Sequence, residues 1–176
     1  DGARFIAQAI EKGAVAILAG AAVDVPAAVA VLRADNPRRA LALMAARFYS
    51  TAPETIVAVT GTNGKTSIAA FARQIWAGLG LEAASLGTIG LIRPSGQVVD
   101  SLTTPEPVTL HKLLCELAGE GVTHLSMEAS SHGLAQCRLD GVRLSAAAFS
   151  NIGHDHLDYH RDAEDYFAQK LRLFRT

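Results

Sequence analysis

The stretch "VAVTGTNGKTSIAAF", from Val57 to Phe71, most constrains what this chain can fold into. A run of β-branched residues leads into a glycine-rich turn, and Lys-Thr-Ser then opens an apolar helical pattern, which predicts a strand, a loop and a helix. Glycines let the backbone N–H groups of such a loop turn inward around phosphate oxygens, and the start of the helix adds its positive dipole end. The Walker pattern has a glycine at the position of Val59. Here the first glycine is Gly61, so the loop is a compact variant.

In such a loop Lys65 can reach the β- and γ-phosphates of a nucleotide, and the Thr66 hydroxyl can bind Mg²⁺. A glycine turn before a helix, followed by an exposed lysine, is the alternative interpretation. The agreement of strand, loop and helix start favours the phosphate site.

Composition excludes several classes of protein. The 176 residues are 49% hydrophobic and 19% charged with a net charge of −1, typical of a globular protein with one domain or two small ones and without a nucleic-acid footprint. No apolar run reaches the roughly 20 residues of a membrane helix. Cys115 and Cys137 lack metal-type spacing and fit a reduced cytoplasm. The chain does not begin with Met, so we expect a fragment, and we expect a monomer.

The sequence predicts an α/β fold in two parts, residues 1–53 and 54–176. In the first part, helical patterns near residues 3–13 and 36–49 enclose short strands at 14–18 and before Leu32. The polar segment 50–55 is the predicted linker. The first part therefore has the elements of a small α/β unit.

The second part alternates strands and helices, which indicates a parallel sheet. Ligands of such sheets bind at the carboxyl ends of the strands. The loop at Gly61, the side chain of Glu128 and the segment 150–156 all follow predicted strands. We therefore expect them to meet at one edge of the sheet, with a hairpin turn at 93–98 elsewhere.

Four motifs carry a resemblance to a known family. The loop at 58–66 resembles the ATP-binding loop of the Mur ligases, and related loops occur in folylpolyglutamate and cyanophycin synthetases. The segments "LTTPEP" (102–107), "MEASSHGLAQCR" (127–138) and "DHLDYHRDAEDYFAQK" (155–170) are similar to the MurE type of this family. The opening at 1–18 is similar to the later part of its N-terminal domain.

The resemblance implies a function and its site residues. The fold would be the remainder of a UDP-N-acetylmuramoyl-binding domain (1–53) and the N-terminal part of a parallel-sheet, P-loop-type ATP-binding domain (54–176), without the C-terminal domain. Catalytic residues would be Lys65, Glu128, His156 and Lys170. ATP would be held by Gly61, Thr62, Asn63, Gly64, Lys65, Thr66 and Ser67, and Mg²⁺ by Thr66, Glu128, His156 and Lys170.

Lys170 has two interpretations. It shares an apolar helical stripe with Phe167, Leu171 and Phe174, and periodicity alone also fits a lysine whose ammonium reaches water. Burial would lower its pKa and favour the neutral amine, which can add CO₂. The resemblance implies such a carbamate as a metal ligand. Glu128 has a similar alternative, a carboxylate in a surface loop, and His154 and His160 stay unassigned.

By resemblance the substrate, a UDP-N-acetylmuramoyl dipeptide, would contact Thr103, Thr104, Ser130, Gln136 and Arg138. The implied reaction adds a diamino acid, diaminopimelate or lysine, through an acyl phosphate in the cytoplasm, with no nucleic-acid or membrane partner. The fragment alone would be inactive. Alternatives are another Mur-family ligase, a nucleotide-dependent switch, or an inactive nucleotide-binding fragment.

The tetrapeptide "DNPR" (35–38) has the letters of a motif that selects diaminopimelate in this family, but there it lies in the C-terminal domain. Asn-Pro is also a good helix start, and we interpret it in that way.

Overall fold

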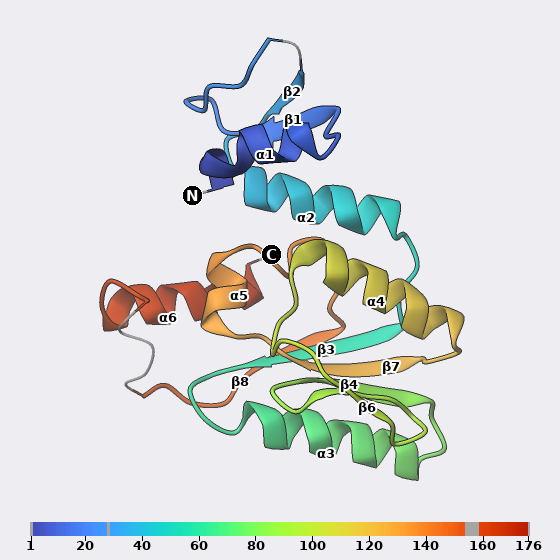
Figure 1. Ribbon diagram of the computed structural model, residues 1–176. Helices are drawn as coiled ribbons and strands as arrows, with labels where there is room; N and C mark the ends of the chain where they lie inside the picture. The colour runs from blue at the N-terminus through green and yellow to red at the C-terminus, as the bar shows by residue number, and fades with distance from the viewer. Residues whose placement is uncertain (1, 28, 154–158, 176) are drawn as a thin grey trace.

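The computed structural model describes residues 2–27, 29–153 and 159–175. The first part of the chain is a small α/β unit (Figure 1). A short 3₁₀ turn (Gly2–Phe5) leads into α1 (Ile6–Glu11), and β1 (Ala16–Ala19) pairs in parallel with β2 (Ala30–Arg33). The long helix α2 (Pro37–Phe48) follows. These elements agree with the prediction for residues 1–49.

The second part is built on a six-stranded sheet in the order β6-β5-β4-β7-β3-β8. Four of its strands are parallel: β4 (Ala83–Gly87), β7 (His124–Glu128), β3 (Thr55–Thr60) and β8 (Ala146–Phe149). β5 (Gly90–Ile92) and β6 (Val98–Val99) extend the sheet by antiparallel pairing. The predicted parallel sheet is confirmed, and the hairpin turn between β5 and β6 lies where it was predicted.

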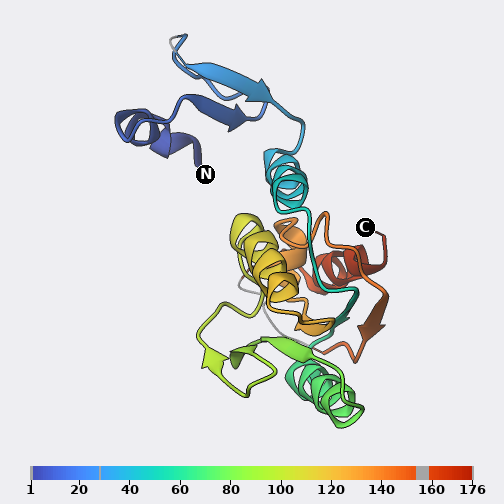
Figure 2. The ribbon, with the colours of Figure 1, turned by 90° about the vertical axis from the view of Figure 1, so that its right-hand side faces the viewer.

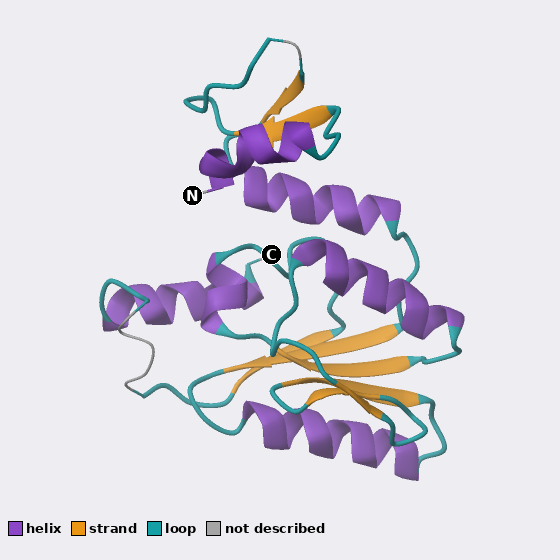
Figure 3. Cartoon of the chain, viewed as in Figure 1, coloured by secondary structure: helices purple, strands orange, loops and turns teal. Residues whose placement is uncertain are grey.

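Helices cover both faces of this sheet (Figures 1 and 3). α3 (Lys65–Gly78) lies on one face. α4 (Pro107–Gly119), the short α5 (Ser131–Ala135) and α6 (Ala163–Leu171) with a 3₁₀ turn (Arg172–Phe174) lie on the other. Figure 2 shows α2 above α4, so the two parts meet through these helices. The predicted division at residues 53 and 54 falls in the segment between α2 and β3.

The core lies between the central strands and α4. Strands buried on both faces are rich in apolar and β-branched residues, as β3 is. The largest fully buried apolar side chains of this core are Ile56, Leu86, Leu91, Leu110, Leu114, Leu117, Leu125 and Met127. The burial of this core fixes the strand ends that carry the site.

Three helices bury a different face from the one that periodicity indicates. In α3 the stripe that includes Phe71 and Ile75 is exposed, at 60% and 63%, whereas Ala69 faces the sheet. In α2 periodicity indicates a stripe of Leu41, Met44, Ala45 and Phe48, of which only Ala45 is buried. Ala42 is buried as well, and the three larger side chains are exposed. Small alanines let these helices approach their neighbours closely, and a pattern of large apolar residues does not reveal that.

In α6 the difference concerns a site residue. Phe167 and Phe174 are about half exposed, and the buried residues are Tyr166, Lys170 and Leu173. The lysine is therefore buried on a face that it shares with a tyrosine, rather than in the predicted stripe of phenylalanines.

Candidate phosphate-binding site

The carboxyl ends of the four parallel strands bring the predicted site together. The glycine loop follows β3, Glu128 is the last residue of β7, and Ser150 follows β8. Because β3 lies between β7 and β8, these ends are neighbours. The expected convergence at one sheet edge is confirmed for the loop, Glu128 and residues 150–153. The predicted site residue His156, like His154, lies outside the described residues.

The segment after β8 anchors the glycine loop. The backbone N–H of Thr62 donates to the Asn151 carbonyl (3.0 Å), and the N–H of Asn63 donates to the Asn151 side-chain oxygen (3.0 Å). Ser150 donates from its hydroxyl to the Asn63 carbonyl (2.7 Å), and the Gly153 N–H donates to the Thr62 hydroxyl (2.9 Å). The loop conformation is therefore set by two strand ends together.

Two glycines are required by this geometry. Gly61 has φ 137°, and a Cβ at this position would lie 2.0 Å from the Ser150 hydroxyl oxygen. Gly64, the residue before α3, has φ 84°. Both values lie in the region that glycine tolerates and L-residues avoid. The chain can therefore turn tightly from β3 into α3. The N–H groups of the first helical turn have no partner within the helix, and Ser67 in that turn is exposed.

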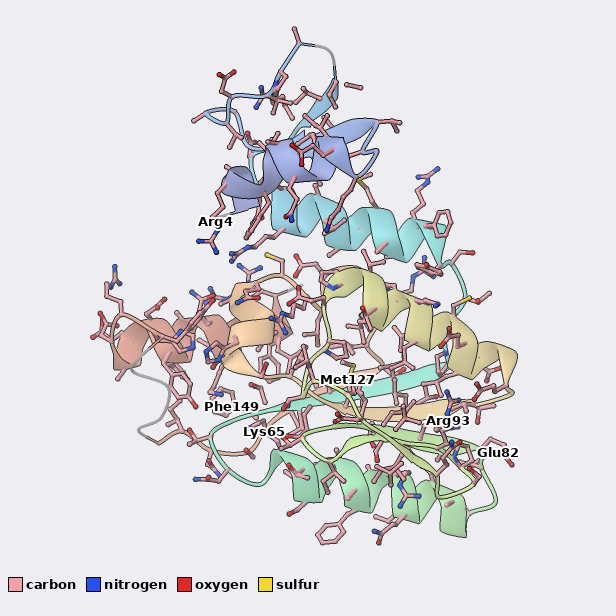
Figure 4. All side chains as sticks on the ribbon, in the orientation of Figure 1. Arg4, Lys65, Glu82, Arg93, Met127 and Phe149 are labelled. Carbon is pink, nitrogen blue, oxygen red and sulfur yellow. The ribbon has the colours of Figure 1, made fainter. Side chains whose placement is uncertain are left out.

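Two lysines converge on one carbonyl of the loop. Nζ of Lys65 donates to the carbonyl oxygens of Gly61 (2.9 Å) and Thr62 (2.8 Å), and Nζ of Lys170 donates to the same Gly61 oxygen (2.8 Å). Figure 4 shows Lys65 where the loop enters α3. Two ammonium groups and the N-terminus of a helix thus concentrate positive charge at the loop, which suits an anion.

Lys170 is buried, with 1% of its surface exposed, and Nζ lies 4.3 Å from the centroid of the Tyr166 ring. The alternative of a lysine that reaches water is therefore wrong. The Gly61 carbonyl and the aromatic face both stabilise the ammonium form, whereas burial favours the neutral amine.

Glu128 is also buried, at 1% exposure, so the surface-loop interpretation is wrong. Thr88, just after β4, holds its carboxylate: the backbone N–H donates to Oε1 (2.8 Å) and the hydroxyl to Oε2 (3.2 Å). Glu128 lines a small cavity together with Thr66. A carboxylate and a hydroxyl on one cavity are hard oxygen donors of the type that Mg²⁺ prefers.

The sequence did not indicate Thr88 as a site residue. Its hydroxyl also lies 3.2 Å from that of Thr103, so it connects Glu128 to the segment 102–107. The available signal was its position directly after a parallel strand.

Four of the five residues expected to contact substrate, Thr104, Ser130, Gln136 and Arg138, are linked by hydrogen bonds, and Thr103 joins them through Thr88 and Glu128. Thr104 is buried, donates to the Glu128 carbonyl (3.0 Å) and accepts from the Ser130 N–H (3.0 Å). Ser130 accepts from the Gly133 N–H and so starts α5. The hydroxyl of Thr104 therefore orients the short segment between β7 and α5.

Arg138 links Thr104 to Gln136 and to Glu106. Its guanidinium donates to the Thr104 carbonyl (2.7 Å) and the Gln136 side-chain oxygen (2.7 Å), and it pairs with Glu106 at 2.6 Å. Gln136 donates in turn to the hydroxyl of Tyr159 (3.1 Å). The structure thus brings Thr103, Thr104, Ser130, Gln136 and Arg138 together beside Glu128.

His160 is buried in an aromatic group with His132, Tyr159 and Tyr166, and its Nδ1 lies 3.6 Å from a carboxylate oxygen of Asp165. In the described part of the chain, no three side chains of His, Cys, Asp or Glu cluster as a metal site would require. Helices in the same part are too short or too polar to cross a membrane.

The model of the Mur ligase middle domain matches residues 59–176. The chain belongs to the Mur ligase family. The match contains the glycine loop, Thr88, Glu128 and Lys170.

Curated relatives named UDP-N-acetylmuramoyl-L-alanyl-D-glutamate--2,6-diaminopimelate ligase cover the chain. The relative from Agrobacterium fabrum is 60% identical over 176 residues, 100% of this chain and 36% of its own length. That from Rhizobium meliloti is 58% identical over 174 residues, 99% of this chain and 36% of its own length. The chain therefore spans about a third of the length of these relatives.

Solved structures agree with the fold. A structure of a UDP-N-acetylmuramoyl-L-alanyl-D-glutamate--2,6-diaminopimelate ligase superposes with a TM-score of 0.78 at 30% identity and covers 98% of this chain and 35% of its own. A MurF ligase from Thermotoga maritima in complex with ADP has a TM-score of 0.57 at 18% identity, with 98% and 37% covered. The latter supports the fold alone.

Proposed function

We propose that the protein containing this chain is an ATP-dependent ligase that joins 2,6-diaminopimelate to UDP-N-acetylmuramoyl-L-alanyl-D-glutamate in the cytoplasm. The observation that carries the proposal is the convergence of Lys65 and Lys170 on the Gly61 carbonyl, next to a buried Glu128. The names of relatives up to 60% identical supply the substrates.

The loop from Gly61 to Ser67 would bind the ATP phosphates. The phosphate oxygens would replace the Gly61 and Thr62 carbonyls as acceptors for the Lys65 ammonium. Transfer of a phosphoryl group between two anions needs positioning and positive charge rather than a protein nucleophile. Lys65 and the N-terminus of α3 supply both at the loop.

Glu128 and Thr66 fit a magnesium ion because they line one cavity and offer a carboxylate and a hydroxyl. We assign His156 and Lys170 to the same site by resemblance. When bound, Mg²⁺ would neutralise charge on the phosphates. Thr88 would keep the Glu128 carboxylate in place through its N–H and hydroxyl.

Lys170 would act as a carbamate. The ammonium would first lose one proton, and the neutral amine would then form an N–C bond with CO₂ and release a second proton. These two losses convert a cation into a two-oxygen anion. The burial of the side chain supports the neutral amine. The hydrogen bond from Nζ to the Gly61 carbonyl fits the ammonium, so this bond would have to be exchanged on carbamylation.

The dipeptide would lie against the group that contains Thr103, Ser130 and Arg138. Arg138 would exchange Glu106 for an anionic group of the substrate, because a guanidinium pairs well with either. The substrate carboxylate would then face the γ-phosphate. The acyl phosphate formed there would be attacked by the amine of diaminopimelate.

The experiment is ligation by the full-length protein with the dipeptide carboxylate labelled with a heavy oxygen isotope. We expect tripeptide to form with diaminopimelate, and one labelled oxygen to appear in the released phosphate for each bond formed. ATP hydrolysis that does not require the dipeptide would support a nucleotide-dependent switch instead. Preference for lysine would retain the mechanism and change the substrate.

A further inference from the structure

Tyr166 lies on α6, one helical turn before Lys170, and is buried to 1% exposure. Its hydroxyl lies 3.1 Å from the hydroxyl of Thr62, 104 residues earlier in the chain. This contact joins α6 directly to the glycine loop. Neither Tyr166 nor this contact has a part in the function proposed above.

Thr62 contacts two other segments of the chain. Its hydroxyl accepts from the Gly153 N–H (2.9 Å) and lies 3.1 Å from the Tyr166 hydroxyl, and its backbone N–H donates to the Asn151 carbonyl. Thr62 also directly follows Gly61, whose carbonyl receives both lysines. A shift of Thr62 would therefore move the acceptor of the two ammonium groups.

The Tyr166 ring contacts two further side chains. Nζ of Lys170 lies 4.3 Å from its centroid, and the His160 ring centroid lies 5.2 Å away at an interplanar angle of 56°. A ring fixed in this way presents its hydroxyl to Thr62 in one direction.

We propose that Tyr166 is a positioning residue, whose hydroxyl sets the glycine loop through Thr62 in the geometry that binds nucleotide phosphates. This inference rests on the proposed nucleotide role of the loop. Tyr166 acts through Thr62 and needs no contact with the nucleotide itself. Removal of the Tyr166 hydroxyl should therefore weaken nucleotide binding only in proteins that have a hydroxyl at position 62.

The test measures ADP affinity by calorimetry in the full-length protein, without turnover. Six variants are compared with the wild type: Tyr166→Phe, Thr62→Val, their double variant, Thr62→Ser, the double variant of Thr62→Ser with Tyr166→Phe, and Tyr49→Phe. Tyr166→Phe keeps the ring beside Lys170 and removes only the hydroxyl. Tyr49→Phe is the matched control, because Tyr49 is the C-cap residue of α2 and belongs neither to the glycine loop nor to α6.

We expect Tyr166→Phe to weaken ADP binding about fivefold when Thr62 is present, the equivalent of about 1 kcal/mol. With Thr62→Val it should cause no further loss, because residues that act as a pair are not additive. Tyr49→Phe should bind as the wild type does. Thr62→Ser keeps a hydroxyl, so Tyr166→Phe should again lower the affinity in that variant.

Unchanged binding by Tyr166→Phe would overturn the inference, and so would an equal loss with Thr62 present and with Thr62→Val. Failure of the wild type to bind ADP would instead contradict the nucleotide role of the loop. If Tyr166→Phe does not fold, Thr62→Val against Thr62→Ser makes the same comparison from the loop, and equal affinities there would also overturn it.

Discussion

At the scale of single residues, the carbonyl oxygen of Gly61 is the point where the charges of the site meet. It accepts from Lys65 and from Lys170, which come from elements more than 100 residues apart. In the proposed reaction the two lysines have different roles, since Lys65 stays a cation and Lys170 becomes an anion. The environment of Lys170 permits both, because its contacts favour the ammonium and its burial favours the amine.

Substitution of Lys170 tests this dual character. In the full-length protein Lys170→Ala should lower turnover at least about a hundredfold through the loss of charge stabilisation at the phosphates. A short added carboxylate should restore part of the activity by filling the vacated space. Lys170→Arg should stay inactive, because guanidinium does not take up CO₂. An active arginine variant would contradict the carbamate.

Some site residues are predictable from the sequence, because local patterns define them. Others are not, because their roles depend on contacts between distant parts of the chain. Gly61, Lys65 and Glu128 are recognised because local pattern and position at a strand end define them. Thr88 and Tyr166 act through contacts with residues 40 and 104 positions away. Such contacts depend on the order of the strands and on which face of α6 is buried, and neither follows from periodicity.

At the scale of elements, the tetrapeptide "DNPR" (35–38) is explained by its position at the N-terminus of α2. The Asn36 side chain accepts from the Arg39 N–H (3.1 Å), and Pro37 occupies the first turn. Asn36 also donates to the sulfur of Cys137 (3.6 Å), and Arg39 pairs with Asp140 at 3.1 Å. The interpretation of "DNPR" as a helix start is confirmed.

A pair of substitutions separates this role from substrate selection. Asn36→Ala removes the cap of α2 and should lower the free energy of unfolding by about 1 kcal/mol. Arg38→Ala, at an exposed position in the same tetrapeptide, should change it by less than about 0.5 kcal/mol. Urea unfolding measures both. Neither variant should alter the preference for diaminopimelate over lysine, and a switch would restore the motif as a selector.

The helix positions themselves were predictable, but their buried faces were not. In α3 the exposed Phe71 and Ile75 form the more hydrophobic stripe, yet Ala69 packs on the sheet, where Ser126 donates to its carbonyl oxygen (2.6 Å). A close approach of helix and sheet requires small residues. Hydrophobic periodicity therefore identifies the helix but predicts the wrong face of it to be buried.

At the scale of the whole molecule, α4 connects the two parts of the chain. It packs under α2 and carries His111, which is buried and lies 3.2 Å from the Asp140 carbonyl oxygen through Nε2. Burial lowers the pKa of His111 below its ordinary value of 6.5, and the hydrogen bond to Asp140 opposes this with a smaller effect. The folded state therefore prefers the neutral imidazole.

This preference gives a pH dependence with a definite sign. Below about pH 6.5 the unfolded chain binds more protons at His111 than the folded chain does, so stability is lost as the pH falls. Urea midpoints should decline less from about pH 7 to pH 5 in His111→Gln than in the wild type. Equal slopes in the wild type and His111→Gln would contradict the assignment.

In the proposed reaction the glycine loop holds the phosphates of ATP during ligation. The most direct measurement is the ATP-dependent ligation rate of full-length Lys65→Ala beside Lys112→Ala, a control at an exposed lysine of α4. We expect Lys65→Ala to fold normally and to lose about a hundredfold or more in turnover, and Lys112→Ala to retain the wild-type rate. Near-normal ligation by Lys65→Ala would contradict the account.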